Sequence, residues 1–304
     1  MKTIQPELNF NLKNFNTYKL SSIADVAYIP NTIEELVDVL KNLDNFVILG
    51  AGSNVILSTT GIKTPVILTH KLNKIEIAEN IVSVECGVKS AYLSKIVAEN
   101  SLSGFEFLAP IPSFIGGAIY MNASAHGQAI SDVFLEACVY DVDAKKVLTL
   151  KKEDMQFAYR KSILQEKRCI LLNAKFALVQ KEKSEILEKI NENISKRQKT
   201  QPSLKTPNAG SIFKNPEGSS AGALIEQVGL KGKTIGGAQI SELHANFIVN
   251  LGTAKSSDIL ELMFFTYNEV EKKFNIKLKP EVIFIGEKTE AEDRIWQRLQ
   301  NKVK

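Results

Sequence analysis

A glycine turn between two short apolar runs constrains the fold of this chain more than any other feature. Gly50-Ala51-Gly52 follows an apolar run at residues 46–49 that is typical of a buried strand, and Val55-Ile56-Leu57 comes directly after the turn. In a dinucleotide-binding βαβ unit, the turn carries a third glycine and opens a helix. Here valine stands at that position and the chain continues as strand. The sequence therefore argues against a doubly wound sheet and favours an α+β architecture with mixed sheets.

Composition and the N-terminus indicate an ordinary soluble protein. The 304 residues are enough for two or three compact units, and the hydrophobic content of 44% and charged content of 24% are typical of globular proteins. No apolar run approaches the ~18 residues that span a bilayer. Residues 1–6 lack the apolar region of a signal peptide. We therefore expect a cytoplasmic protein with no membrane insertion.

Cysteines, histidines and charge exclude two other classes of protein. Cys86, Cys138 and Cys169 lie far apart without metal or redox spacing, and the three histidines are isolated. We expect reduced, mostly buried thiols and no metal. The net charge is +4, and the lysines of residues 181–205 are not interleaved with aromatic residues. A nucleic-acid site is therefore not expected.

Local patterns predict helices and strands along the whole chain. Thr32 is a predicted N-cap, with Glu35 placed to reach back to the Thr32 amide. Two prolines and several polar residues at 199–207 predict a linker, where we place a domain boundary. The charged residues 287–304 predict a helix packed on the body. The predicted helices lie at 32–42, 90–100, 183–197, 220–228 and 256–274, and the predicted strands at 46–49, 65–69, 75–78, 81–86, 133–142, 146–150, 168–179, 234–240, 246–250 and 281–285.

Two segments rich in small residues are candidate cofactor surfaces. Amides in the turn at 49–54 can form an anion-binding nest, with Ser53 and Asn54 adding polar side chains. A purely structural turn explains the same residues. The segment 111–123 contains glycines and alanines that leave a low surface for a flat aromatic cofactor, and Asn122 offers a donor and an acceptor. A close helix–helix contact explains these small residues as well.

Three polar side chains could carry chemistry, and each has a simpler explanation. Arg160 could grip a carboxylate with two parallel hydrogen bonds, or lie on the surface. Ser211, in a loop crowded with Asn, Gly and Pro, could present its hydroxyl at a defined point, or belong to a plain turn. Glu281, in an apolar strand, needs a partner or a cavity that raises its pKa, unless it faces water at the strand edge.

The motifs in their order resemble one family. They are LGAGSN at 49–54, IPSFIGGAIYMNA at 111–123, YRKS at 159–162, QPSLKTPNAGSIFKNP at 201–216, HANFIVN at 244–250 and PEV at 280–282. Together they resemble the UDP-N-acetylenolpyruvoylglucosamine reductase family, from about residue 14 to about residue 286. The stretch PNAGSIFKNP is the most specific.

The resemblance implies a fold and a reaction. The fold is the FAD-binding fold of the vanillyl-alcohol-oxidase type in two subdomains, with a third α+β domain for substrate. This implies subdomain 1 at 1–70, with the 287–304 tail packing back on it, subdomain 2 at 71–199, and a substrate domain at 200–286. In the implied reaction NADPH reduces non-covalently bound FAD, and hydride passes to C3 of UDP-N-acetylglucosamine enolpyruvate. Protonation of C2 then gives UDP-N-acetylmuramate, a precursor of peptidoglycan. We expect a monomer.

The resemblance also implies roles for individual residues. Ser211 matches the proton donor to C2, and Arg160 and Glu281 match the pair that stabilises the enol intermediate. The residues expected to line FAD are Gly50, Ala51, Gly52, Ser53, Asn54, Pro112, Gly116, Gly117, Asn122 and Ala123. Those expected to face the sugar nucleotide are Lys199, Lys214, Asn215, Lys231 and His244.

The chain departs from the family pattern at a few positions. It is similar to the class without a substrate-gripping tyrosine loop between Arg160 and Ser211. Phe114 stands where a hydroxyl residue is usual near the FAD diphosphate, which makes Ser113 the candidate replacement. His126 replaces a common tyrosine. Lys19-Leu20-Ser21-Ser22 replaces a usual Arg-x-Gly-Gly pattern, and Ile283 lacks the basic residue often found two places after the glutamate.

Two other functions are weighed against this one. Another flavin oxidase of the same fold would lack PNAGSIFKNP and would often show a histidine for covalent flavin attachment beside the first glycine turn, where none occurs. A non-catalytic nucleotide-binding module would lack Arg160, Ser211 or Glu281, and all three are present.

Overall fold

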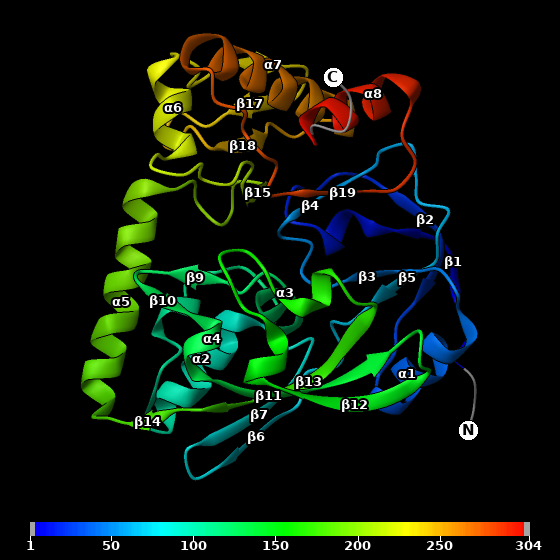
Figure 1. Cartoon of the computed structure of the whole chain (residues 1–304), viewed down its shortest axis with the longest axis vertical. Helices are drawn as coiled ribbons and strands as arrows, with labels where there is room; N and C mark the ends of the chain where they lie inside the picture. Colours follow the sequence, from blue (N-terminus) through cyan, green and yellow to red (C-terminus); the bar gives the residue numbers. More distant parts are fainter. Residues whose placement is uncertain (1–3, 301–304) are drawn as a thin grey trace. The chain divides into compact units, whose positions relative to one another are not determined.

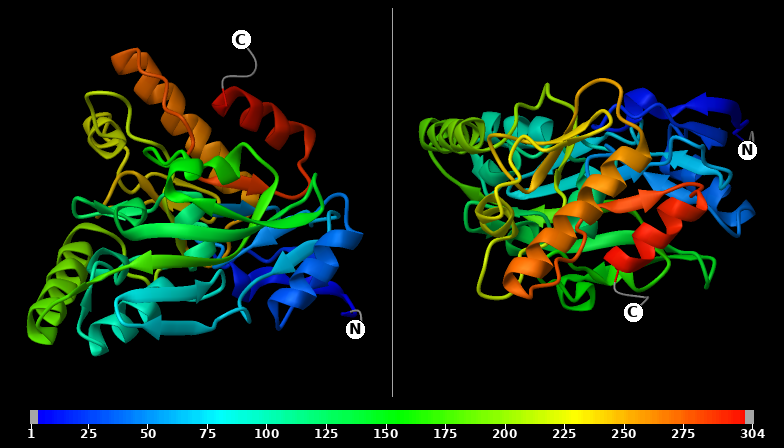
Figure 2. Two further views of the ribbon diagram at one scale, coloured as in Figure 1. Left: turned by 60° about the horizontal axis from the view of Figure 1, so that its bottom comes forward. Right: turned by 90° about the horizontal axis from the view of Figure 1, so that it is seen from above.

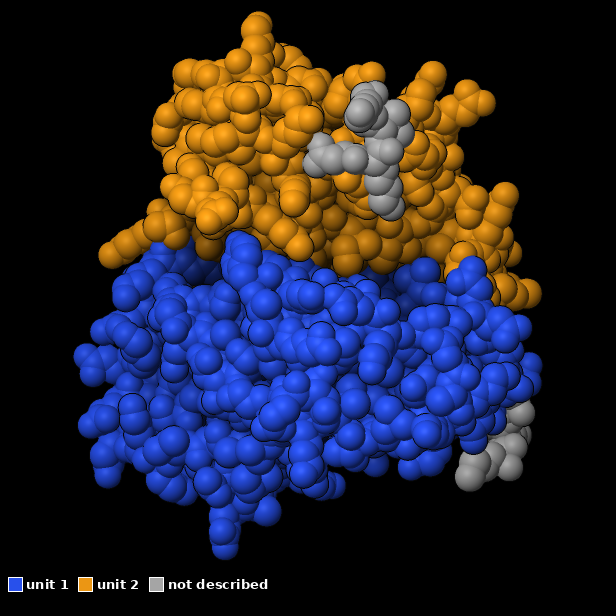
Figure 3. Space-filling view, viewed as in Figure 1, with its two compact units in different colours: residues 1–6, 28–51, 67–197 blue, residues 7–27, 52–66, 198–304 orange. Residues whose placement is uncertain are grey.

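The computed structural model describes residues 4–300, and these residues group into two compact units. Unit 1 contains residues 4–6, 28–51 and 67–197, and unit 2 contains residues 7–27, 52–66 and 198–300 (Figure 3). Each unit is therefore assembled from segments that are distant in sequence. The predicted division into three domains stays a prediction; its boundary at residue 199 lies beside the change of unit between residues 197 and 198.

Unit 1 is built on a five-stranded sheet in the order β12-β11-β13-β7-β6, with antiparallel neighbours (Figure 1). Strand β13 alternates so that Leu172, Ala174 and Phe176 are buried, as the two-residue period of a strand requires. Phe176 meets Phe105 edge-on, with ring centroids 4.9 Å apart. The strands of this sheet are β6 (Ile75–Ala78), β7 (Ile81–Glu85), β11 (Phe134–Asp141), β12 (Lys146–Lys151) and β13 (Cys169–Ala177).

Short helices and strands complete unit 1. Helix α3 packs on β7 and β13, and the apolar face of α5 packs with Ala98 of α2 through Ile186 and Ile190. The remaining elements are α1 (Ile33–Asn42), β3 (Val47–Leu49), β5 (Val66–Leu68), α2 (Ser90–Glu99), β8 (Leu102–Ser103), α3 (Ile115–Tyr120), β9 (Ser124–Ala125), β10 (Gln128–Ala129), α4 (Ile130–Val133), β14 (Val179–Gln180) and α5 (Lys183–Thr200), with 3-10 turns at Glu106–Leu108, Lys152–Met155 and Ile163–Gln165.

Helix α1 begins as predicted, with one difference in its cap. The Thr32 hydroxyl accepts the Glu35 amide at 3.2 Å, which satisfies one of the free N–H groups of the first turn. The Glu35 carboxylate reaches the backbone amide of Asn31 at 2.7 Å, one residue before the position we expected.

Unit 2 contains a four-stranded sheet, a parallel strand pair and a long helix. The sheet order is β15-β18-β17-β16, and β19 pairs in parallel with β4. Helix α7 packs on β16, β17 and β4. The elements are β1 (Glu7–Asn11), β2 (Ile23–Tyr28), β4 (Val55–Leu57), β15 (Asn208–Ser211), α6 (Ala221–Gln227), β16 (Thr234–Ile235), β17 (Ala238–Ile240), β18 (Phe247–Asn250), α7 (Ser256–Phe274), β19 (Ile283–Ile285) and α8 (Glu290–Leu299), with a 3-10 turn at Leu12–Phe15.

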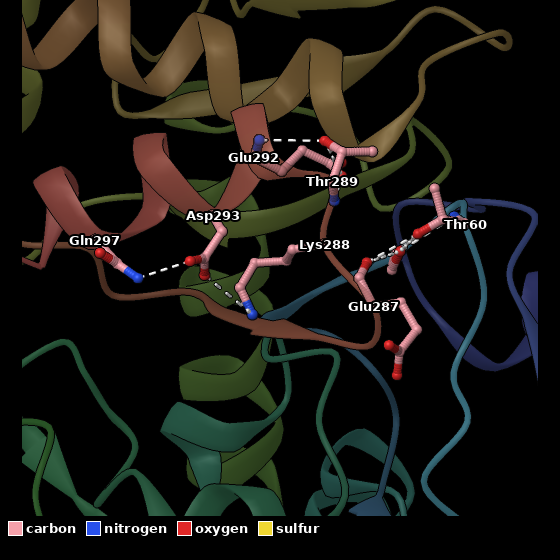
Figure 4. A network of polar contacts seen from close by, with 8 residues as sticks. Thr60, Glu287, Lys288, Thr289, Glu292, Asp293 and Gln297 are labelled. Carbon is pink, nitrogen blue, oxygen red and sulfur yellow. Dashed lines mark hydrogen bonds and ion pairs between the residues drawn. The ribbon is translucent and has the colours of Figure 1, made fainter.

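The C-terminal helix α8 packs on α7, and the two helices lie side by side in each view (Figure 1, Figure 2). Glu292 is buried and accepts hydrogen bonds from the Thr289 amide at 2.9 Å and the Ser256 hydroxyl at 2.8 Å. Just before the helix, the carbonyl of Glu287 accepts a bond from Thr60 at 2.9 Å (Figure 4). The tail is helical as expected. Its helix packs on α7, from the predicted substrate domain, and Glu287 bonds Thr60 of the predicted subdomain 1, so the assignment of the tail to that subdomain stays a prediction.

Most predicted helices are confirmed. The helix expected at 256–274 is α7 at the same bounds, and α5 continues to Thr200 where we expected a linker to have begun. Within residues 4–300, no helix combines the length and the apolar character that crossing a membrane requires.

Candidate active site

Packing within the protein explains why the turn has glycine at position 52. Gly52, in unit 2, has φ of +62°, and a Cβ atom there would lie 2.3 Å from the Phe15 carbonyl oxygen. The backbone amide of Thr17 donates to the Gly52 carbonyl at 3.1 Å. A residue with a side chain would have to displace the segment that wraps this turn. At Gly50, in unit 1, a Cβ would meet only the Phe114 ring, at an ordinary 3.6 Å.

Asn54 at the end of this turn is bonded to the segment of Glu281, which lies just before β19, since that strand begins at Ile283 and not at Glu281 as predicted. Its side-chain amide donates to the Glu281 carbonyl at 3.1 Å, and its own carbonyl accepts the Ile283 amide at 3.0 Å. Ser53 lies at the same edge, since its carbonyl is 4.0 Å from the position of a Cβ on Gly210. Within unit 2, the predicted cofactor turn therefore adjoins the segments of Ser211 and Glu281.

Gly116 and Gly117 of α3 differ in their surroundings: packing explains the first glycine but not the second. A Cβ at Gly116 would lie 3.1 Å from the Cys86 carbonyl oxygen, so the helix needs glycine there to pack on β7. Gly117 is exposed, and a Cβ there would meet nothing within 4 Å. No packing contact with a described residue explains Gly117, whereas a flat ligand lying on α3 would. Pro112 is also exposed, and Ala123 is half-buried.

Ser113 is already engaged within unit 1. Its hydroxyl lies 2.7 Å from the Ser90 hydroxyl, and its carbonyl accepts the Ser90 amide at 2.9 Å. One of the two hydroxyls must donate to the other. Ser113 therefore ties the predicted FAD segment to the first turn of α2, and either serine hydroxyl could still accept a further bond.

Asn122 holds two loops together. Its side chain is buried, its amide donates to the Ala158 carbonyl at 3.1 Å, and its oxygen accepts the Ser131 amide at 3.2 Å. Both polar atoms that we had assigned to FAD thus have protein partners. Because Ala158 starts the turn that bears Arg160, Asn122 orients that turn.

Arg160 stands at the tip of a four-residue turn in a strained conformation. The backbones of Ala158 and Lys161 bond to each other in both directions, at 3.2 and 3.1 Å. Between them Arg160 has φ of +55°, a region that favours glycine. A residue other than glycine in a strained conformation costs about 1–3 kcal/mol and is frequent at functional sites.

The Arg160 side chain is oriented from several sides. Its Nη1 donates to the Ser124 hydroxyl at 2.9 Å, and its guanidinium carbon lies 5.1 Å from the centre of the Tyr159 ring. The Gln165 side chain donates to the Arg160 carbonyl at 3.0 Å and to the Tyr120 carbonyl at 2.7 Å. In unit 1, Arg160 therefore lies beside the end of the segment 111–123 that is predicted to line FAD, since Tyr120 belongs to that segment and Ser124 follows it.

Ser211 follows a β-bulge. Between the pairs Asn208–Val249 and Ser211–Phe247, strand β15 has one residue more than β18, and Gly210 within this interval has φ of +74°. Bulges of this kind bend a strand and re-aim the next side chain. Among residues 4–300, the Ser211 hydroxyl has no hydrogen-bond partner, and the side chain is half-buried.

Glu281 lies on the backbone next to the Ser211 strand. The Glu281 amide donates to the Ile212 carbonyl at 2.8 Å, and the Lys214 amide donates to the Lys279 carbonyl at 2.9 Å. This pairing places Glu281 opposite the residue that follows Ser211. Two of the three catalytic candidates are thus neighbours in unit 2, whereas Arg160 belongs to unit 1 and is placed only relative to that unit.

Of four predicted substrate-binding residues, two already have partners within the protein. Lys199 is exposed near the end of α5, and Lys214 is half-buried. Asn215 accepts the Ala221 amide at 3.0 Å, which caps α6. Lys231 forms an ion pair with Glu226 at 2.6 Å.

His244 is held as a neutral hydrogen-bond donor. Its Nδ1 accepts the backbone amide of Asn246 at 3.2 Å, and its ring meets Phe247 edge-on at 4.8 Å. Burial lowers the pKa of His244, and the charge of Lys231 lowers it further. At pH 7 the ring is therefore neutral, and its hydrogen is on Nε2.

Three positioning side chains were missed by sequence reasoning. They are Ser124 and Gln165 around Arg160, and Asn246 beside Ser211. Asn246 lies inside a motif that carried the family resemblance, which was a signal that could have found it. Ser124 and Gln165 stand in ordinary stretches, and only the folded chain shows what they bind.

Two family models match the chain. Residues 201–285 match the C-terminal domain of UDP-N-acetylenolpyruvoylglucosamine reductase, and residues 24–149 match an FAD binding domain. The first match covers the segments of Ser211 and Glu281, and the second covers the glycine turn and α3.

Relatives at high identity cover nearly the whole chain. The UDP-N-acetylenolpyruvoylglucosamine reductase of Caldicellulosiruptor saccharolyticus is 42% identical over 91% of this chain and 90% of its own length. That of Bacillus licheniformis is 42% identical over 92% of this chain and 94% of its own length. The crystal structure of the Thermus caldophilus UDP-N-acetylenolpyruvylglucosamine reductase superposes with a TM-score of 0.79 at 32% identity, covering 93% of this chain and 98% of that one.

Proposed function

The chain belongs to the UDP-N-acetylenolpyruvoylglucosamine reductase family, and from that premise we propose that it reduces UDP-N-acetylglucosamine enolpyruvate to UDP-N-acetylmuramate with NADPH as hydride donor. It is a flavin-dependent oxidoreductase with an FAD-binding fold of the vanillyl-alcohol-oxidase type. The proposed reaction supplies peptidoglycan precursor in the cytoplasm and so serves cell-wall growth, cell shape and division. The enzyme acts as a monomer in this proposal.

The residues of the glycine turn and of α3 fit a non-covalently bound FAD. The open surface over Gly117 gives a flat ring system backbone to lie on, since no described side chain fills that space. When bound, FAD supplies the hydride chemistry that no side chain of the chain can perform. The proposed FAD-lining residues are Gly50, Ala51, Gly52, Ser53, Asn54, Pro112, Gly116, Gly117 and Ala123, with Asn122 acting through the Arg160 turn.

Arg160 holds the substrate carboxylate in this proposal. One guanidinium N–H donates to Ser124, and the planar guanidinium has the geometry to form parallel hydrogen bonds with a carboxylate. Negative charge grows on that carboxyl group as hydride arrives at C3, and a fixed cation stabilises it most when it is already oriented. The strained turn and the bonds from Gln165 provide that orientation before substrate arrives.

Ser211 protonates C2, and Glu281 stabilises the enol beside it. A serine hydroxyl of ordinary acidity donates a proton only to a strongly basic carbanion. Its placement must therefore be tight: the bulge at Gly210 aims the side chain, and the bond between Ile212 and Glu281 fixes the backbone after it. Lys214, three residues after Ser211, assists by placing a cation on the same loop. Lys199, Asn215, Lys231 and His244 bind the sugar nucleotide in this proposal.

The observation that carries the proposal is the Ser211 hydroxyl. It has no hydrogen-bond partner among the described residues, yet its backbone pairs with β18 at Phe247, and the next residue, Ile212, bonds the Glu281 amide. Proton transfer to a bound substrate requires a hydroxyl that is not bonded within the protein and that stands on an ordered backbone.

Anaerobic half-reactions test the proposal. NADPH should bleach the flavin absorbance of the purified protein, and UDP-N-acetylglucosamine enolpyruvate should restore it. In Ser211→Ala, bleaching should persist at the wild-type rate, while recovery by substrate should fall by a factor on the order of 10³. Failure of the substrate to reoxidise the wild-type flavin would refute the function, and equal loss in both half-reactions would refute the role of Ser211.

A further inference from the structure

The Asn246 side chain forms a paired contact with the backbone of the Ser211 loop. Its oxygen accepts the Phe213 amide at 3.1 Å, and its amide donates to the Phe213 carbonyl at 2.8 Å. The side chain is only 3% exposed. One carboxamide thus satisfies both backbone groups of one residue, as a neighbouring strand would.

The same residue also bonds through its backbone. The Ile212 amide donates to the Asn246 carbonyl at 2.9 Å. On the opposite side, the Ile212 carbonyl accepts the Glu281 amide at 2.8 Å. Residues 212 and 213 are therefore held between Asn246 and the segment 279–281, which precedes β19. Strand β18 begins only at Phe247, so the Asn246 side chain extends the pairing beyond the end of the strand.

The contact of the Asn246 side chain with Phe213 lies two residues from the proposed proton donor, Ser211. The register shift at Gly210 interrupts regular pairing just before Ser211, so the backbone on that side gives less support. The bonds from Asn246 supply it on the other side. Loss of either bond would leave a buried amide or carbonyl of Phe213 without a partner, and the loop would shift to satisfy it.

We propose that Asn246 is a positioning residue that fixes Ser211, relative to Glu281, for proton transfer to the enolpyruvyl substrate. The inference rests on the proposed function and adds to it a side chain that touches neither substrate nor cofactor. Its effect is confined to the substrate half-reaction. A displacement of the hydroxyl by about 1 Å costs on the order of 10²-fold in rate.

Asn246→Asp tests the proposal through pH. An ionised carboxylate accepts the Phe213 amide but repels the Phe213 carbonyl, whereas a protonated carboxyl group accepts from one and donates to the other. Burial raises the pKa of such a carboxyl group. The rate of substrate-driven flavin reoxidation, divided by the wild-type rate at the same pH, should fall about 10²-fold at pH 8 and recover at least tenfold by pH 5.5.

The ratio removes titrations that both proteins share. The titratable groups on the segments bonded to Asn246 are His244, Lys214, Lys279 and Glu281, and each is present in wild type and variant alike. Asn246→Ser, which is smaller and has no titratable group, should lose the substrate half-reaction at every pH. It also keeps the test decisive if Asn246→Asp does not fold with FAD.

Asn250→Asp is the matched control. Asn250 is also buried and is the last residue of β18, four positions after Asn246, but its side chain bonds Tyr18, Gly252 and Ala254. Its ratio to wild type should show no recovery at low pH, although its stability should fall as that of Asn246→Asp does.

Each outcome decides the inference separately from the function. Wild-type rates of reoxidation in both Asn246 variants, or a ratio for Asn246→Asp that does not change with pH, would overturn the positioning role. Equal losses in flavin reduction by NADPH would also overturn it, since they indicate general damage. All of these comparisons require a wild-type protein that turns over the substrate, so failure of the proposed function is seen first and independently.

Discussion

Alanine at Gly116 and at Gly117 should change stability in opposite directions. Both glycines lie in the first turn of α3, where alanine is better by about 0.5–1 kcal/mol. At Gly117 a Cβ meets nothing within 4 Å, so Gly117→Ala should gain that amount. At Gly116 the Cβ would lie 3.1 Å from the Cys86 oxygen and 3.2 Å from its Cβ. Overpacking of this kind costs about 1–3 kcal/mol, so Gly116→Ala should lose about 1 kcal/mol net.

Gly117→Ala, which should raise stability, should weaken the binding of FAD. If the cofactor lies on Gly117, a methyl group there occupies its place, and the dissociation constant should rise about tenfold, which corresponds to about 1.4 kcal/mol. Urea denaturation of the flavin-free proteins measures the first effect, and titration with FAD followed by flavin fluorescence measures the second. Gly117→Ala that binds FAD like wild type would refute the cofactor surface, and Gly116→Ala that is as stable as wild type would refute the packing argument.

Two further changes test other parts of the molecule. Arg160→Lys keeps the charge but loses the planar guanidinium and its bond to Ser124. Its FAD content should be normal, but substrate-driven reoxidation of the flavin, followed by stopped flow, should be roughly 10²-fold slower. An unchanged rate would show that the charge alone suffices. Trp296→Ala removes a ring that is 8% exposed and lies 6.0 Å from the Phe284 ring; unfolding free energy should fall by about 3 kcal/mol, and a loss below about 1 kcal/mol would mean that α8 adds little to unit 2.

Local patterns predicted the elements well because their causes are local. The apolar spacing of residues 256–274 and the Thr32 cap depend on neighbours within one or two turns, and both are confirmed. The end of α5 was predicted three residues early because polar side chains and a following proline resemble a linker until the helix is seen to continue to Thr200.

Residue types alone did not reveal why each glycine or asparagine is needed. Gly52 and Gly116 face backbone atoms of distant segments, and Gly117 faces none. In the sequence, Asn122 was predicted to line FAD, and Asn246 was only one residue of the HANFIVN motif. Their hydrogen bonds to Ala158 and Phe213 show that each asparagine holds a loop, near Arg160 and near Ser211.

The sequence by itself determined the family, the α+β class and the candidates Arg160, Ser211 and Glu281, because ordered motifs and hydrophobic periods are properties of the chain. Only the tertiary structure shows that the backbones next to Ser211 and at Glu281 are paired, and that Arg160 is strained beside Ser124. It also shows that Asn246 bonds Phe213 in the loop that follows Ser211. These depend on contacts between residues tens of positions apart. Such contacts form only when burial of the apolar cores offsets the entropy of closing long loops.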